Sequence, residues 1–294
     1  MRNVKEEICG LTMEAGFCEA KILSGTERFE PPAGTHMRRR IDSPTLLVAA
    51  LPYGNNSAEA PTISEAVIAP FARKNYYRSA VQRLQKLSQT FRKRFGGTKE
   101  DYRVFCNSPA PEKLFAVACG LGVAGRNSLI ITHSAGSLVI IAAMTIPYPL
   151  DGDPALTTDP CGACIACVSA CPTRAVRGDG YIDRLRCIQW YASGNEETVP
   201  PHVAEKWGRI LYGCTFCQDV CPYNQRLIAG VETDIGLLPP SMNALELIAM
   251  SDYEIQAFFK GSAMGLSRLK PQHIRRNAIL VLYGRTPPYA SVFP

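Results

Sequence analysis

The chemistry available to this chain is concentrated in two groups of cysteines near its middle. The first group, Cys161 to Pro172, has the spacing C-x2-C-x2-C-x3-C-P, and the second, Cys214 to Pro222, has the spacing C-x2-C-x3-C-P. Bacterial ferredoxins use the first spacing for iron–sulfur clusters, because thiolates on one tight loop can surround a cubane while the cysteine before proline points at another. These two groups therefore predict two 4Fe–4S clusters.

The same rule distributes the cysteines between the two clusters. The first three cysteines of the first group need a distant fourth ligand, which the last cysteine of the second group supplies. The cysteine before Pro172 then serves the other cluster, and Cys187, which lies between the groups, replaces the thiolate that this cluster lacks. The predicted ligand sets are Cys161, Cys164, Cys167 and Cys221 for one cluster, and Cys171, Cys187, Cys214 and Cys217 for the other.

Two other uses of cysteine agree less well with this pattern. Disulfides suit short secreted chains, whereas this chain has 294 residues and no visible export signal. Structural zinc sites usually pair C-x2-C units and rarely use a cysteine followed by proline. The spacing therefore favours iron–sulfur chemistry over both.

The composition sets wider limits. With 46% hydrophobic residues the chain can build a sizeable core in one or two domains. The formal charge of +6 would fall to about +2 with two clusters of about −2 each, so it is only a weak indication of nucleic-acid binding. Exposed clusters and the remaining thiols survive best in a reducing compartment, so we expect a cytoplasmic protein. The longest apolar run, Leu138–Ile146, is too short to span a membrane.

Hydrophobic periodicity and turn signals predict the elements that must position these residues. Helices are expected over residues 1–24, 64–95, 111–119, 242–258 and 268–282, and strands over 45–51, 102–106, 128–132 and 138–146, the last two forming a hairpin. This pattern predicts an α+β fold: a mixed α/β first domain (1–155), a ferredoxin-like module with two 4Fe–4S clusters (156–230) and a short helical segment (231–294).

The predicted helix over 64–95 has a strongly basic character. Its cations are Arg73, Lys74, Arg78, Arg83, Lys86, Arg92, Lys93 and Arg94. Such a run forms a solvated helix face in most proteins, and contact with phosphate groups is the alternative.

An iron–sulfur module passes single electrons, so the chain needs an external one-electron donor of the flavodoxin or ferredoxin type. The sequence has no P-loop and no G-x-G-x-x-G after a strand, because Gly120–Gly125 follows a predicted helix. Nicotinamide binding is therefore not supported.

Four stretches resemble the epoxyqueuosine reductases, cobalamin-dependent iron–sulfur enzymes that complete queuosine in tRNA. They are Pro109–Ala116 with Gly120–Leu129; Gly136–Ile141; the cysteine block with its lone Cys187 and Tyr212–Asn224; and Phe259–Ala278. Together these stretches span most of residues 40–282, so the chain resembles a short and divergent member of this family.

The resemblance implies a base-off cobalamin between the first domain and the cluster domain, fed with electrons by the near cluster. The residues that it places near the corrin are Gly125, Arg126, Asn127, Ile130, Ser137, Ile141, Gln189 and the loop Cys214–Cys217. Core packing would explain Ile130 and Ile141 equally well, and a tight turn would explain Gly125.

The chain departs from the family where a general acid is expected. The family has an aspartate six residues before the glutamate that matches Glu112, and here that position is Cys106. A thiol can donate a proton, with an ordinary pKa of about 8.5, but Cys106 could also ligate cobalt or only pack. The substrate is then epoxyqueuosine in tRNA or one suited to a thiol. The alternatives are an electron carrier without cobalamin and a corrinoid enzyme like the reductive dehalogenases.

Many members of the family continue into helical repeats that help to hold tRNA. The resemblance therefore implies that contact with tRNA falls here to the basic helix and to four later cations. These are Arg268, Lys270, Arg275 and Arg276. Binding through so few cations would be weaker and more sensitive to salt.

Overall fold

A computed structural model describes residues 4–25, 41, 43–54, 64–226, 229–265 and 268–283. The chain forms two compact units. The first draws on residues 1–54, 76–163 and 226–232, and the second on 55–75, 164–225 and 233–294. These units are discontinuous in the sequence and do not coincide with the three expected segments, whose status as domains stays a prediction. Among the described residues no helix is long and apolar enough to cross a membrane.

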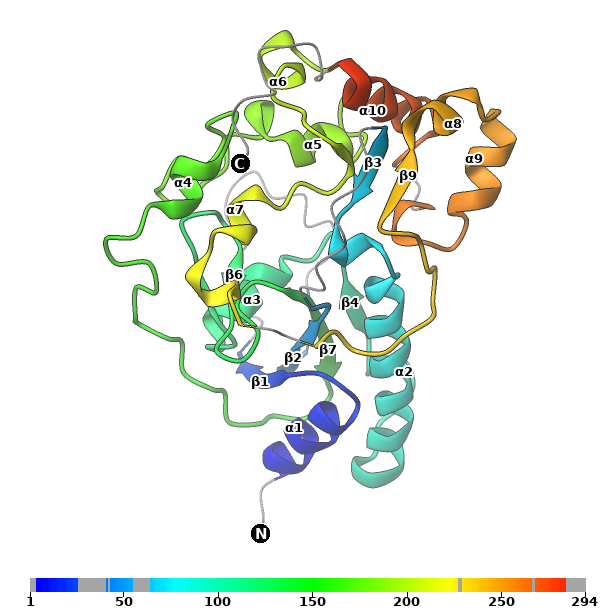
Figure 1. Ribbon diagram of the computed structural model, residues 1–294. Coiled ribbons are helices and arrows are strands. Elements are labelled where there is room, and N and C mark those ends of the chain that lie inside the picture. Colours follow the sequence, from blue (N-terminus) through cyan, green and yellow to red (C-terminus); the bar gives the residue numbers. More distant parts are fainter. Residues whose placement is uncertain are drawn as a thin grey trace. The chain divides into compact units, whose positions relative to one another are not determined.

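The first unit is built on a four-stranded antiparallel sheet in the order β1-β2-β7-β4 (Figure 1). Its strands are β1 (Glu19–Ser24), β2 (Thr45–Pro52), β7 (Val139–Ile146) and β4 (Val104–Cys106). Residues on both faces of β2 are buried, which accounts for its continuous apolar sequence. Helix α3 (Glu112–Ala118) packs on one face, with Phe115 and Ala116 against alternate residues of β2. Helix α2 (Tyr76–Phe95) packs against β4 and β7, and α1 (Val4–Glu14) packs against β1.

Three expectations for this unit are wrong, one because a glycine ends a helix early and two because tertiary contacts override a local pattern. The helix expected from residue 1 ends at Glu14, because Gly16 has a φ of +96°, and β1 follows and pairs with β2. The helix expected from residue 64 begins only at Tyr76. The expected hairpin is absent from the described residues, since β7 pairs with β2 and β4, whereas β6 (Ile130–Ile131) pairs with β5 (Val123–Ala124).

The residues before α2 belong to the second unit. Strand β3 (Glu65–Ile68) lies between β8 (Ile210–Tyr212), to which it is parallel, and β9 (Ser241–Asn243), to which it is antiparallel. Pro70 then opens the short 3₁₀ helix η2 (Pro70–Ala72). The strand could not be predicted locally, because both of its partners lie more than 100 residues further along the chain.

The second unit carries many short helices around this small sheet. They are α4 (Ala166–Ala170), η3 (Arg184–Arg186), α5 (Ile188–Ala192), α6 (Pro201–Ala204), α7 (Phe216–Asp219) and η4 (Pro222–Asn224), followed by α8 (Ala244–Ala249), α9 (Asp252–Phe259), η5 (Ala263–Gly265) and α10 (Pro271–Tyr283). The helix expected over 242–258 is divided into α8 and α9, because Ser251 starts α9 with a capping box to Glu254. The helix expected over 268–282 is confirmed as α10.

Candidate iron–sulfur and catalytic sites

Four cysteines of the second unit lie close enough to affect one another electrically. Cys171 follows α4, Cys187 precedes α5, Cys214 follows β8 and Cys217 lies in α7. The pKa of the Cys214 thiol is raised first by burial and then by the charges of the other three. Burial and the charges of Cys187, Cys171 and Cys167 raise the pKa of Cys217 to about 12. These interactions place the four cysteines near one another, with Cys167 of the other predicted set also near Cys217, and the division into two ligand sets stays a prediction.

Hydrogen bonds and a glycine hold these cysteines in place. The backbone N–H of Ala175 donates to Cys171 Sγ at 3.2 Å. The backbone N–H of Cys214 donates to Gln189 Oε1 at 3.0 Å, so Gln189 lies beside a predicted cluster ligand. Gly213 has a φ of +87°, and a Cβ atom there would lie 2.3 Å from Ala69 Cβ. Only glycine can therefore lead β8 into Cys214 without displacing the chain.

The set predicted for the other cluster is divided between the units. Cys161 belongs to the first unit, and Cys164, Cys167 and Cys221 belong to the second. Cys164 is exposed and Cys221 is buried. In the described part of the chain no three His, Cys, Asp or Glu side chains are arranged to hold a single metal ion. A cubane requires a different arrangement, because each thiolate binds a different iron and the sulfurs lie farther apart than around one ion.

The loop Gly125–Asn127 lies against Cys161 within the first unit. The backbone N–H of Arg126 donates to Cys161 Sγ at 3.4 Å, and Arg126 Nη2 donates to the carbonyl of Gly162 at 2.7 Å. A Cβ atom on Gly125 would lie 2.8 Å from Ile131 Cδ1, so this glycine serves the packing of its own loop. Asn127 Oδ1 accepts a hydrogen bond from the N–H of Leu129. Three of the residues predicted near a corrin thus lie beside the first predicted cluster ligand.

The other corrin-facing candidates of the first unit differ in exposure. Ile130 is 4% exposed and lies in the core with Phe115 and Ala116, which favours the core interpretation for this residue. Ser137 is buried, and its carbonyl accepts a hydrogen bond from Tyr53 Oη at 3.4 Å. Ile141, near the start of β7, is half-buried and packs against the same core, so it presents only part of its apolar surface.

Cys106 is the last residue of β4, at the end of the sheet where β7 begins. The register pairs Cys106 with Ala142 and Phe105 with Ala143. Because side chains alternate along a strand, Cys106 lies on the sheet face opposite to Ile141. The structure therefore brings these two predicted residues to one end of the sheet but not to one face.

Sequence reasoning missed the hydrogen bonds that tie Glu112 to the loop after Cys106. Glu112 Oε1 accepts hydrogen bonds from Ser108 N at 3.0 Å and from Ser108 Oγ at 2.8 Å. Burial raises the pKa of Glu112. Burial and then the charge of Glu112 raise the pKa of Cys106 to about 12. A serine four residues before a glutamate is one residue too far for a capping box, so the spacing gave no signal.

Several cations proposed to contact tRNA have partners within the protein. Arg275 donates to the carbonyl of Met250 and to Asp252, and Arg276 donates to the carbonyls of Tyr191, Glu196 and Glu197. Lys270 pairs with Glu197 at 3.4 Å, and Arg83 donates to the carbonyls of Ala15 and Glu232. These groups stabilise the fold, so they contribute less to an external ligand than their number suggests.

Helix α2 also has a basic face directed to solvent. Arg78, Lys86 and Lys93 are exposed, and so are Gln82, Gln85 and Gln89 between them. These six positions follow one side of the helix, and α2 contains no acidic residue.

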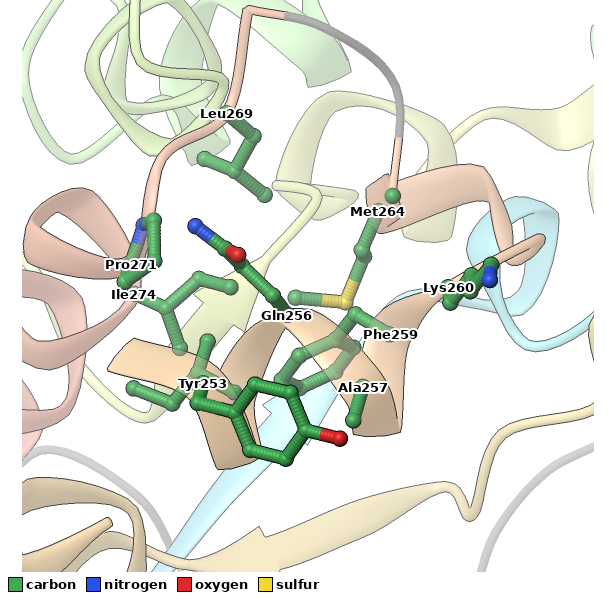
Figure 2. A pocket seen from close by; sticks show the side chains of 11 residues that line it. Tyr253, Gln256, Ala257, Phe259, Lys260, Met264, Leu269, Pro271 and Ile274 are labelled. Carbon is green, nitrogen blue, oxygen red and sulfur yellow. The ribbon is translucent and has the colours of Figure 1, made fainter. Parts of the chain in front are cut away.

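The second unit also contains a cavity of about 450 Å³ between α9, η5 and α10. Figure 2 shows Gln256 between Leu269 and Ile274, with Met264 and Phe259 beside it. None of the predicted site residues lines it. The cavity is largely apolar and has no acid–base pair or cysteine, so it is not where the predicted chemistry would take place.

The cysteine block corresponds to a known class of cofactor-binding domain. Residues 160–224 match the family described as a 4Fe-4S double cluster binding domain. The fold and its cysteines therefore define a protein with a domain for two 4Fe–4S clusters.

Relatives of known function are similar over a larger part of the chain. Epoxyqueuosine reductase of Cyclobacterium marinum is 37% identical over 179 residues, 60% of this chain and 56% of the relative. The enzyme of that name from Synechocystis sp. is 32% identical over 211 residues, 70% of this chain and 71% of the relative. The chain belongs to the epoxyqueuosine reductase family, and it spans little more than half the length of the Cyclobacterium relative.

Solved structures agree in fold. The epoxyqueuosine reductase of Bacillus subtilis, solved with its catalytic Asp loop swung out of the active site, superposes with a TM-score of 0.77 at 25% identity. A structure of epoxyqueuosine reductase with an epoxyqueuosine-modified tRNA stem loop superposes with a TM-score of 0.77 at 24% identity. Each match covers 96% of this chain and 81% of the other.

Proposed function

We propose that this protein is an iron–sulfur oxidoreductase that reduces epoxyqueuosine to queuosine in tRNA with the help of a corrinoid. The observation that carries the proposal is the group formed by Cys171, Cys187, Cys214 and Cys217, in a chain of the epoxyqueuosine reductase family. The iron–sulfur spacing alone indicates electron transfer, and the family relationship indicates what would accept the electrons. Only the two together specify this reaction.

The two clusters would transfer electrons one at a time. Cys161, Cys164, Cys167 and Cys221 would hold one cluster, and the group around Cys187 would hold the other. Hydrogen bonds to sulfur tune the reduction potential of such clusters, and the N–H groups of Arg126 and Ala175 are placed for this at Cys161 and Cys171. The electrons would come from an external carrier of the flavodoxin or ferredoxin type, which stays a prediction, as does the cytoplasmic location.

The first unit offers a surface that fits a corrinoid in part. The half-buried Ile141 provides apolar contact area, and the loop Gly125–Asn127 lies against Cys161. Gln189, which accepts a hydrogen bond from the N–H of Cys214, stays a predicted corrin contact. When bound there, a corrinoid would supply reductive chemistry at the carbon–oxygen bonds of the epoxide.

Cys106 would hold one of the two protons that the reaction needs, and the other would come from solvent. Loss of the epoxide oxygen as water consumes two electrons and two protons, so a donor must stay protonated at neutral pH. Burial and Glu112 keep Cys106 in the thiol form, with a pKa of about 12. A thiol with this pKa is a weaker acid than the aspartate of the relatives, so we expect slower turnover than with a carboxylic acid there.

Contact with tRNA would rest mainly on the solvent-facing side of α2. Arg78, Lys86 and Lys93 lie seven or eight residues apart, which places them about 10–12 Å from one another along the axis. Glutamines between them can donate hydrogen bonds to phosphate or sugar oxygens. A helix face with cations and without acidic residues is suited to binding the negatively charged backbone of RNA.

The test is anaerobic reconstitution with iron, sulfide and cobalamin, followed by EPR and by assay of epoxyqueuosine-modified tRNA. We expect a base-off cob(II)alamin signal that stays with the protein, and formation of queuosine in the tRNA. Two reducible clusters without bound cobalamin would overturn the proposal, and the chain would then act as an electron carrier.

A further inference from the structure

The connection between β4 and α3 is a short closed loop. Directly after Cys106, Asn107 has a φ of +51°, in the left-handed region that few side chains adopt. Pro109 and Pro111 limit the backbone on either side of Ala110. Ser108 Oγ donates to Glu112 Oε1 and accepts a hydrogen bond from the N–H of Ala110. The loop is thus fixed at both ends, by the sheet and by Glu112.

Glu112 acts on this loop rather than on its own helix. Both hydrogen bonds that Oε1 accepts come from Ser108, four residues earlier in the chain. The N-cap position of α3 is Pro111, which offers no side-chain cap, and the stronger hydrogen-bond effects on the Glu112 carboxylate come from Ser108 rather than from the helix N–H of Glu112 itself. The next residue, Lys113, donates to the carbonyl of Ser128 at 2.9 Å. Glu112 and Lys113, at the start of α3, therefore bind two different loops, one at Ser108 and one at Ser128.

We propose that Glu112 is a positioning residue for Cys106: its hydrogen bonds to Ser108 fix the loop that presents the thiol at the end of β4. The importance of this for turnover rests on the proposed function, in which Cys106 donates a proton. Without these bonds, Asn107 could leave its left-handed conformation and the thiol would no longer hold one direction. The charge of Glu112 also opposes ionisation of the thiol, which agrees with the raised pKa of Cys106.

The experiment measures alkylation of individual cysteines by iodoacetamide in the anaerobic holoenzyme, followed by peptide mass spectrometry. Glu112→Gln and Ser108→Ala are compared with the wild type, and Lys113→Gln is the matched control at the start of α3. Cys119 serves as an internal reference, because it is buried at the other end of the same helix. We expect Cys106 to react about tenfold faster in Glu112→Gln, and less so in Ser108→Ala, while Cys119 stays unreactive.

Two results would overturn the proposal. Unchanged alkylation of Cys106 in Ser108→Ala would mean that the loop does not depend on these bonds, because that variant removes the hydroxyl hydrogen bond and keeps the charge of Glu112. Equal acceleration at Cys106 and Cys119 would mean that Glu112 only stabilises α3. Turnover is measured separately: Glu112→Gln should lower kcat with little change in KM, and should add nothing in a Cys106→Ala background. If Cys106→Ala keeps full turnover while the alkylation result holds, the proton-donor role fails and the positioning role stands.

Discussion

The cysteine block and the β4–α3 connection place their reactive groups in different ways. In the cysteine block, close spacing along the chain accounts for part of the grouping, since Cys214 and Cys217 lie near each other with only two residues between them. In the connection, Cys106 depends on its register with Ala142 and on a carboxylate six residues later. Chemistry based on local spacing can be predicted from sequence, whereas chemistry based on strand register cannot.

The largest effect should follow removal of Cys187, which lies between the two cysteine groups and is a predicted ligand of one cluster. Cys187→Ala should lose about half of the iron, because one cluster loses a ligand and the other keeps all four. Turnover should fall below detection, since electrons would no longer pass through both clusters. Iron and sulfide analysis of the anaerobically purified protein measures this. Cys9→Ala is the control, because Cys9 lies in α1, outside both groups; a Cys187→Ala protein with all eight irons would contradict the ligand count.

The second-largest effect is expected at Cys106, in the β4–α3 connection, which is the less predictable of the two regions. Cys106→Ala should reduce the rate of epoxyqueuosine reduction by about 10²–10⁴-fold, the usual contribution of a positioned acid, without loss of iron. Cys106→Asp should restore activity, because a carboxylic acid would then occupy the position of the relatives' aspartate. Single-turnover assays with modified tRNA measure both variants. Unchanged turnover in Cys106→Ala would make this thiol a packing residue.

The comparison also explains which parts of the fold could be predicted. Strand β7 and the end of α2 at Phe95 agree with the sequence, because a continuous apolar run and the glycine pair after Phe95 act locally. Strand β3 could not be predicted, since a four-residue segment takes strand form only with partners distant in the sequence. Pairing of β7 with β2 instead of β6 has the same cause.

The candidate site shows the same division. The cluster cysteines were predicted from their spacing and Gln189 from resemblance to a family, and both assignments stay predictions, although Gln189 does lie beside Cys214. The hydrogen bonds between Ser108 and Glu112 had no sequence signal, because they require the left-handed turn at Asn107. Likewise, eight cations could be counted on the predicted helix, but only packing shows that Arg83 is bound to backbone carbonyls.

The smallest effect concerns the exposed face of α2. The sequence shows the cations of this helix, and the structure shows which of them are exposed. Replacing Arg78, Lys86 and Lys93 together by Gln should weaken binding of an RNA stem loop by about 10–100-fold near physiological salt. The slope of log Kd against log salt should fall by about 2, since about 0.7 counterions are released per phosphate contact on a single strand. Replacing Gln82, Gln85 and Gln89 by Ala on the same face is the matched control and should change the affinity about twofold or less. Equal losses in both variants would show that the face matters through its shape rather than its charge, and an unchanged slope in the first would exclude α2 from the RNA contact.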